Sequence, residues 1–172
     1  MTTRVTAAVL SGLLALALAG CTTPEPVEPT PTPAFSSEEE AFAAAEETYR
    51  AYVDALNARH ADPAATPSPT DFLIGQALES ELDTQSILAE QERSIVGDAE
   101  MTRFAGTNFA NDLGEVTAVV CLDVSNSRVV DSDGTDVTPS DRPPVLALEI
   151  VFTPINDGLA VSASAVADDQ TC

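Results

Sequence analysis

Every second residue between 115 and 124 is apolar, and this alternation sets the class of fold that the chain can adopt. The residues concerned are Val116, Ala118, Val120, Leu122 and Val124. A period of two is that of a β-strand, in which successive side chains point to opposite faces of the sheet. The positions between them include Val119 and Cys121, so both faces are largely apolar. We therefore expect a central strand that other elements cover.

Two helical stretches precede this strand. The first is predicted over residues 36–59, where apolar side chains recur every three or four positions. They are Phe42, Ala45, Tyr49, Tyr52 or Val53, and Leu56. A capping box is expected at its start, in which Ser36 pairs with Glu39 or Ser37 with Glu40. The pattern predicts one amphipathic helix with a shallow, alanine-rich apolar face.

A proline-rich loop over residues 60–70 separates this helix from the second stretch, because proline cannot continue a helix. Residues 71–92 again carry apolar side chains at helical spacing. We interpret them as one broken helix or two short ones, capped by Thr70 or Asp71. A bend is expected near Asp83-Thr84.

Further strands are predicted on either side of the central one. Their expected bounds are about 94–105, 127–131, 145–153 and 159–167. Turns are expected at Asp131–Gly134 and Asn156–Gly158, because Asp-Gly tolerates a positive φ. Two helices followed by a run of strands indicate an α+β fold. We expect one domain over residues 36–172, with N-terminal helices packed on a curved, mostly antiparallel sheet.

Residues 1–20 have the organisation of a secretory signal peptide. Arg4 supplies a positive charge, and Val5–Ala19 is an uncharged run of apolar and small residues. That run is shorter than the ~20 residues that cross a bilayer comfortably. The small residues at its end are typical of a processing site, so we expect removal of this segment on export.

The segment Leu18-Ala19-Gly20-Cys21 resembles the cleavage motif of bacterial lipoproteins. The resemblance implies a diacylglyceryl group on the Cys21 thiol and cleavage before this residue. Residues 21–35 are then the lipidated cysteine and a Pro/Thr-rich linker. The protein is expected at the cell membrane, lipid-anchored and facing the extracytoplasmic side, since two acyl chains give stable attachment. The alternative is a plain secretory signal with Cys21 free or in a disulfide.

The charge balance restricts the partners. The chain has seven basic residues, all Arg, and 28 acidic ones. Loss of Arg4 with the signal leaves six Arg against 28 acidic residues, a formal charge of −22. Such a surface repels nucleic acid, so we expect no nucleic-acid partner. Contact with the membrane is expected through the lipid on Cys21.

Three cysteines are present: Cys21, Cys121 and Cys172. If Cys21 carries the lipid, two remain in an oxidising compartment. Cys121–Cys172 is then the only intramolecular disulfide available. The competing interpretation is a buried free Cys121 with a loose Cys172, or an intermolecular pair.

The order of elements resembles NTF2-like (SnoaL-like) domains of lipoproteins from actinobacterial-type organisms. The resemblance rests on the Ala-rich helix Ala43–Ala58, the strand Val119–Val124, the turn Asp131–Gly134 and the closing Cys172. It implies a cone whose hollow end can hold a small molecule. Leu159 departs from the pattern, because such domains often carry Trp after this turn.

Some enzymes of that fold use an Asp or His base and a Tyr donor in an apolar cavity. Tyr49, Tyr52 and Asp123 are the candidate cavity residues, with Asp123 as a buried base on the central strand. The alternative is that the tyrosines close the core with their hydroxyls at its edge. His60, the only histidine, is expected to be a positive residue at the negative end of the first helix. We expect no metal site and no cofactor, because the sequence has no paired-ligand motif.

Two functions therefore remain open. The first is a lipid-anchored surface protein whose domain is a non-catalytic module that binds an unknown protein or a small apolar molecule. The second is a membrane-tethered SnoaL-like enzyme of the isomerase or dehydratase type. We prefer the first, because no catalytic residue set can be assigned. A cavity with Tyr49 or Asp123 in its wall and a raised Asp pKa would favour the enzyme.

Overall fold

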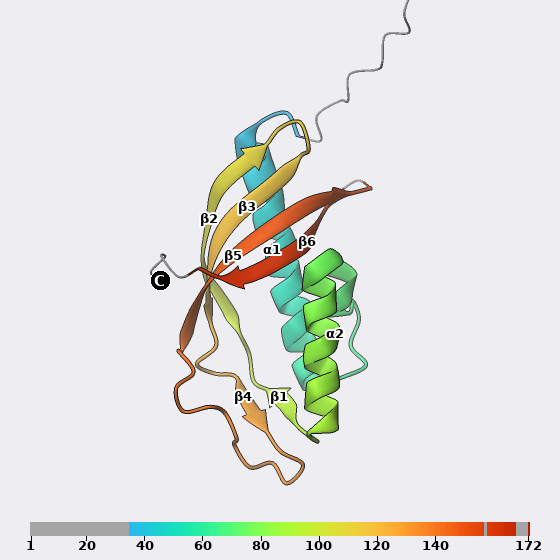
Figure 1. The fold of residues 1–172 in the computed structure, drawn as a ribbon, viewed down its shortest axis with the longest axis vertical. Helices are drawn as coiled ribbons and strands as arrows, with labels where there is room; N and C mark the ends of the chain where they lie inside the picture. Colours follow the sequence, from blue (N-terminus) through green and yellow to red (C-terminus); the bar gives the residue numbers. More distant parts are fainter. Residues whose placement is uncertain (1–34, 157, 168–171) are drawn as a thin grey trace, which may run out of the picture. The chain divides into compact units, whose positions relative to one another are not determined.

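A computed structural model of the protein describes residues 35–156, 158–167 and 172. The predicted signal, Cys21 and the linker up to residue 34 lie outside the described residues. The remainder is an α+β fold, as predicted, with helices packed on antiparallel strands (Figure 1). The helical elements are α1 (Glu38–Ala61), the 3₁₀ helix η1 (Pro69–Phe72) and α2 (Gly75–Glu90). The strands are β1 (Ser94–Val96), β2 (Glu100–Ala110), β3 (Glu115–Asp123), β4 (Arg128–Val130), β5 (Val145–Ile155) and β6 (Gly158–Val166).

Four strands form the main sheet in the order β2-β3-β5-β6, and all neighbours are antiparallel. The short strands β1 and β4 pair with each other in a separate two-stranded sheet. β3 lies between β2 and β5, which confirms the central position predicted from its two apolar faces. Every residue of β3 from Ala118 to Leu122 is buried, so both faces of the strand are covered at its middle.

Helix α1 begins close to its predicted position. Ser37 is the N-cap, and its hydroxyl accepts a hydrogen bond of 3.1 Å from the Glu40 backbone N–H. The Glu40 carboxylate accepts from Ser36, both from the backbone N–H and from the hydroxyl. These bonds lower the pKa of Glu40. Both serines therefore take part in the cap, which satisfies N–H groups that the helix itself leaves unpaired.

The buried face of α1 follows a spacing of four residues. Ala41, Ala45, Tyr49 and Val53 are buried, while Phe42, Tyr52 and Leu56 are half-buried at its margin. Ala55 is buried as well, and alanine at three of the five buried positions lets the helix approach the sheet closely. The Tyr49 ring packs edge-to-face on Phe152 of β5, with ring centroids 6.4 Å apart. Phe152 is itself fully buried in the core.

The second helical stretch is broken earlier than predicted. The break falls at Leu73 and Ile74, and α2 then runs unbroken through the bend expected at Asp83-Thr84. Leu73 pairs with Val161 at the edge of β6, and the Ile74 backbone N–H donates to the Val161 carbonyl. This pairing requires extended backbone, so the helix restarts only at Gly75, whose φ is 52°.

The predicted strand 94–105 is two strands in different sheets. It is interrupted at Gly97, which has a φ of 81° and lies so close to the Asn126 carbonyl that a Cβ would collide with the oxygen. The Asn57 side chain of α1 then makes two hydrogen bonds with the Ala99 backbone. Its Nδ2 donates to the Ala99 carbonyl oxygen at 2.8 Å, and its Oδ1 accepts from the Ala99 N–H at 2.9 Å. The chain therefore changes direction between β1 and β2.

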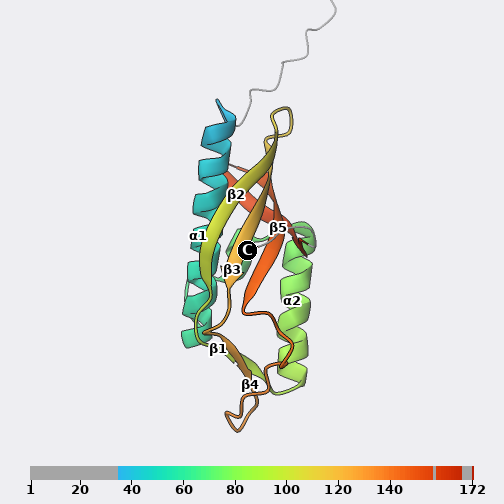
Figure 2. The same ribbon diagram turned by 90° about the vertical axis from the view of Figure 1, so that its left-hand side faces the viewer.

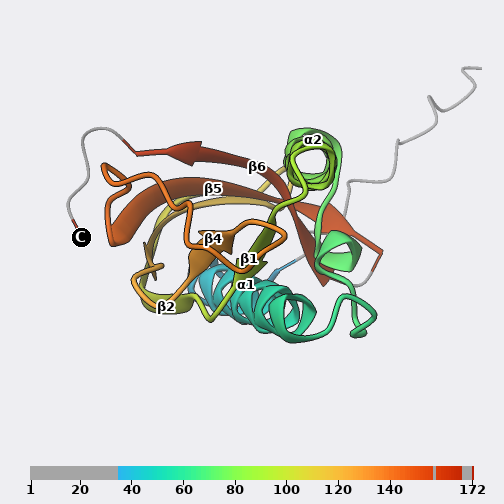
Figure 3. The same ribbon diagram turned by 90° about the horizontal axis from the view of Figure 1, so that it is seen from below.

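The two helices cover different parts of the sheet. Helix α1 lies over the sheet in contact with β2, β3 and β6, whereas α2 lies beside β6. Figures 2 and 3 show α1 and α2 standing apart from each other. α2 has a single buried residue, Ala77, and exposes Leu82 and Ile87. None of the described helices is long and apolar enough to cross a membrane.

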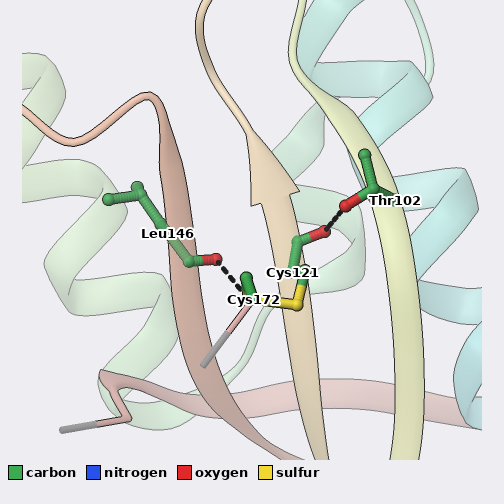
Figure 4. Close-up of a disulfide and its surroundings, with 4 residues drawn as sticks. All are labelled: Thr102, Cys121, Leu146 and Cys172. Atoms are coloured by element: carbon green, nitrogen blue, oxygen red, sulfur yellow. Dashed lines mark hydrogen bonds between the residues drawn. A yellow bond between two sulfur atoms is a disulfide. The ribbon is translucent and has the colours of Figure 1, made fainter. Parts of the chain in front are cut away.

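Cys121 and Cys172 form a disulfide in the structure, with their Cα atoms 5.6 Å apart. Cys121 is buried in β3, and Cys172 lies against β5, its sulfur 3.8 Å from the Leu146 carbonyl oxygen (Figure 4). On the other side, the Thr102 hydroxyl of β2 donates to the Cys121 carbonyl. The pairing predicted from the cysteine count is therefore present, and it ties residue 172 to the middle of the sheet.

Candidate functional site

A hollow lies between α1 and α2, above the sheet. Its volume is about 220 Å³, and its wall combines Tyr49 and Tyr52 of α1 with Ala77 of α2 and Leu148 of β5. Most of the exposed wall is apolar. The hollow exists because α2 packs on β6 and stands apart from α1, which leaves a gap between the helices over Leu122 and Leu148.

A second hollow of about 190 Å³ adjoins the first toward the C-terminal end of α1. The two share five residues: Tyr52, Leu56, Glu81, Thr84 and Leu122. The second hollow adds Arg59, His60 and Arg142 to the wall. We call the two together the interhelical cavity; it has an apolar end near Tyr49 and a polar end near Arg59. An outer hollow of about 400 Å³ also touches Arg59 and His60.

Both candidate tyrosines lie in the cavity wall. Tyr49 is 2% exposed, and its ring centroid is 5.6 Å from that of Tyr52. Burial raises the pKa of both, to about 12 for Tyr52, where the nearby Glu81 charge adds to the effect. Both hydroxyls are therefore neutral at physiological pH and can donate a hydrogen bond to a bound molecule.

Arg59 and Glu81 connect the two helices across the cavity. Nη2 of Arg59 lies 2.6 Å from Oε1 of Glu81, and both side chains are largely buried. Glu81 also accepts a hydrogen bond from Gln85 one turn later on α2. The other terminal nitrogen of Arg59, Nη1, is buried and has no hydrogen-bond partner.

His60 differs from the expectation of a charged residue at the helix end. Its Nδ1 lies 3.0 Å from the Gly97 carbonyl oxygen, and its Nε2 is buried without a partner. Burial is the main cause of a pKa below 6.5, and the Arg59 charge lowers it further. The neutral imidazole is therefore favoured at physiological pH. Because a carbonyl oxygen only accepts, Nδ1 carries the hydrogen and Nε2 is an unpaired acceptor.

Asp123 is not the buried base that the sequence suggested. It ends β3 in a half-buried position, and its carboxylate accepts a hydrogen bond of 2.8 Å from the Ser125 backbone N–H. Hydrogen bonds from Ser125 lower the pKa of Asp123 rather than raise it. It is also absent from the residues that line the interhelical cavity. The structure therefore brings Tyr49 and Tyr52 together and leaves Asp123 outside.

Sequence reasoning missed Glu81 and Arg59. The signal for Glu81 was a charge on the apolar face of α2, since Ala77, Glu81 and Leu88 are separated by four and seven residues. Such a charge needs a partner when it is buried. Arg59 precedes the only histidine, and no sequence pattern marked it as a cavity residue. Their pairing across 22 positions of the chain could be found only in the fold.

Comparisons with known proteins bear on the fold alone. No family model matches the chain, and no curated protein matches it. Among solved structures, the chain is similar to one described as the crystal structure of the intermembrane space region of chloroplast protein ARC6. The two are 13% identical with a TM-score of 0.50, over 73% of this chain and 95% of that one. At this identity the match supports a shared arrangement of helices and strands.

Proposed function

We propose that this protein is a lipid-anchored extracytoplasmic protein whose NTF2-like domain is a non-catalytic module that binds a small, largely apolar molecule in the interhelical cavity. The cavity between α1 and α2 is the observation that carries the proposal. It combines an apolar wall with the side chains of Tyr49 and Tyr52. Mostly apolar hollows with a few polar groups are typical of small-molecule sites.

Binding is preferred over catalysis because of where the carboxylates lie. A tethered isomerase or dehydratase needs a base that faces its substrate. Asp123, the candidate base, lies outside the cavity wall and is bonded to Ser125. Glu81 is the carboxylate in the wall, and its Oε1 is engaged by Arg59 at 2.6 Å. Neither carboxylate is therefore a free base beside the two tyrosines, and His60 lines the polar hollow but not the hollow that contains Tyr49.

The location part of the proposal rests on the sequence Leu18-Ala19-Gly20-Cys21 and on the disulfide. A disulfide in a domain of this kind is characteristic of compartments outside the cytoplasm. Replacement of Cys21 by Ser tests the anchor. The wild-type protein should fractionate with membranes and incorporate a radioactive fatty acid, and Cys21→Ser should do neither. Equal labelling of both versions would exclude the anchor.

Ligand binding can be tested with a neutral, environment-sensitive dye such as Nile red. We expect its fluorescence to rise when it enters the cavity of the full chain carrying Cys21→Ser. The chain has no Trp and two Tyr, both in the cavity wall, so tyrosine emission reports on the same place. Quenching of that emission should follow the same concentration dependence as the dye signal.

A matched pair of variants on α2 locates the dye. Ser80→Phe places a large ring in the apolar hollow, because Ser80 lines it. Ser86→Phe adds the same ring to the same helix at an exposed residue outside both hollows. Dye affinity should fall at least about tenfold for Ser80→Phe and stay unchanged for Ser86→Phe. Equal affinities in both variants would mean that the dye binds elsewhere and would contradict the proposal.

A further inference from the structure

Two buried nitrogens at the polar end of the interhelical cavity lack hydrogen-bond partners. They are Nη1 of Arg59 and Nε2 of His60. Among the described residues that are not exposed, every other buried side-chain nitrogen or oxygen has a partner. A buried polar group without a partner is costly, so two on neighbouring residues of one cavity need an explanation.

The two nitrogens have opposite hydrogen-bonding character. Nη1 of Arg59 can only donate. Nε2 of the neutral imidazole can only accept, because Nδ1 carries the hydrogen toward the Gly97 carbonyl oxygen. A donor and an acceptor on two neighbouring residues that line the cavity complement a carboxylic acid, whose carbonyl oxygen accepts while its hydroxyl donates.

We propose that the ligand of the interhelical cavity is a carboxylic acid with an apolar chain, whose carboxyl group bridges Nη1 of Arg59 and Nε2 of His60. This inference rests on the proposed function and adds the chemical class of the ligand. The chain of the acid lies toward Tyr49 and Leu148, in the apolar hollow. One proton is held between the carboxyl group and His60.

Charge balance supports a shared proton. The cavity end already holds the Arg59–Glu81 pair, the negative end of α1 is adjacent, and the exported chain carries a formal charge of −22 from six Arg and 28 acidic residues. An added anion without a proton would meet an unfavourable field. A carboxylate that binds together with one proton adds no net charge. Phosphate esters fit less well, since only one arm of Arg59 is free and they keep a negative charge after one proton is taken up.

Other charged groups near His60 come from each element packed around it. Arg59 lies on α1 and Glu81 on α2, while Asp98 lies in the turn between β1 and β2. Arg93 lines the outer hollow. Arg142 lines the same end of the cavity, but its guanidinium donates to the carbonyl oxygens of Val124 and Ser127. Within the described residues, Arg59 is thus the cation at the polar end of the cavity that has a buried N–H donor without a partner, at Nη1.

Neither nitrogen is open to water in the structure, so the carboxyl group reaches them when the gap between α1 and α2 widens. α2 is suited to a small outward shift, because Ala77 is its one buried residue. The Arg59–Glu81 pair is the polar contact that α2 makes with the end of α1. Such a shift loses little apolar packing, and it must be small enough for the long side chains of Arg59 and Glu81 to keep their contact.

The test compares octanoate with 1-octanol on the full chain carrying Cys21→Ser. These probes share a chain length and differ in the head group. At about pH 6 we expect octanoate to quench tyrosine emission with an affinity at least about tenfold higher than that of 1-octanol. Because octanoate binding takes up one proton, its affinity should fall by up to about tenfold per pH unit between about pH 6.5 and 8. 1-Octanol affinity should not change over this range.

His60 gives a direct readout of the shared proton. It is the only histidine in the chain, so its imidazole NMR signals need no assignment by mutagenesis. Octanoate should raise the apparent pKa of His60 and shift the Nε2 resonance toward the protonated position. 1-Octanol should produce neither change.

Two variants separate the head-group contact from general charge. His60→Asn keeps an amide N–H for the Gly97 carbonyl and removes Nε2, so octanoate affinity should drop about tenfold and lose its pH dependence. The circular dichroism spectrum of His60→Asn should match that of the wild type, which shows that the domain is folded. Arg93→Gln removes an exposed neighbouring charge and should change octanoate affinity less than about twofold.

The outcomes distinguish this inference from the proposed function. If octanoate and 1-octanol bind with equal affinity and no pH dependence, the carboxylic acid is excluded and the apolar site stands. If octanoate binds tightly but the apparent pKa of His60 is the same with and without octanoate, the shared proton is excluded and the inference is wrong. If neither probe nor Nile red binds, both the inference and the proposed function fail.

Discussion

Arg59 and Glu81 form an ion pair of 2.6 Å between the end of α1 and the middle of α2, with their side chains 21% and 13% exposed. Taking two charges out of water costs free energy, and the pair recovers it only while both partners are present. The cavity wall is therefore held together by a contact that is sensitive to the loss of either side chain.

The first prediction concerns this pair. Glu81→Leu should destabilise the domain by about 2–3 kcal/mol, because it leaves the Arg59 guanidinium buried without a counter-charge. Arg59→Met combined with Glu81→Leu should recover most of that loss, since both charges are then absent. Urea unfolding of the two single variants and the double variant gives the coupling energy. Additive single effects would show that the pair contributes nothing.

The second prediction uses a close contact between α1 and the sheet. A Cβ on Gly106 of β2 would overlap the ring of Phe42 on α1, well inside contact distance. Gly106→Ala should therefore cost about 1–3 kcal/mol through overpacking. Phe42→Leu in the same chain should relieve part of this loss, because it replaces the ring with a smaller side chain.

Gly158 provides the matched control for Gly106. It also lies in a strand, but a Cβ added to it would meet nothing within 4 Å. Gly158→Ala should be neutral or stabilise the domain slightly, by up to about 1 kcal/mol. Thermal unfolding of both alanine variants under the same conditions makes the comparison. Similar losses in the two would mean that Phe42 adjusts without cost.

Local patterns in the sequence were enough to predict the architecture. The period of two in β3 indicated a central strand, and the spacing of Ala45, Tyr49 and Val53 indicated the face of α1. These signals work because they reflect which face of one element is buried. The cysteine count also predicted the Cys121–Cys172 pair, since it needed no knowledge of which strands are neighbours.

The errors came from contacts between distant segments. Leu73 is not helical because it pairs with Val161 at the edge of β6. β1 and β2 are separate strands because the Asn57 side chain is hydrogen-bonded to the Ala99 backbone between them. The spacing of apolar residues within one segment cannot predict either of these contacts. The site shows the same limit, because Asp123 ends an apolar strand but Ser125 engages its carboxylate there. The carboxylate in the cavity wall comes instead from α2.

The third prediction concerns pH. Burial holds the pKa of His60 below its ordinary 6.5 in the folded state, so the unfolded chain binds more protons as the pH falls through this value. Stability should therefore decrease below about pH 6.5, with a slope of at most about 1.4 kcal/mol per pH unit for one proton. Arg59, Glu81 and Asp98 surround the same ring and set the size of the shift.

His60→Asn isolates this contribution from the acidic groups, which titrate at lower pH. The difference in unfolding free energy between wild type and His60→Asn should change between about pH 7 and 5, in favour of the variant at the lower pH. Urea unfolding at several pH values measures it. A difference that stays constant would show that His60 has the same pKa in the folded and unfolded states.

The last prediction concerns the Cys121–Cys172 disulfide, which joins residues 51 positions apart. A loop of that length restricts the unfolded chain, which corresponds to about 4 kcal/mol in the chain-entropy model. Cys121→Ala combined with Cys172→Ser should therefore lower the melting temperature by about 10 °C. Reduction of the wild type should give a similar loss, which controls for the cavity that Cys121→Ala leaves in the buried strand.

The bond itself is checked by mass spectrometry of a non-reduced digest, where the two cysteine peptides should appear linked. Free thiols on both residues in protein from its native compartment, or a melting temperature equal to that of the wild type, would exclude a stabilising disulfide.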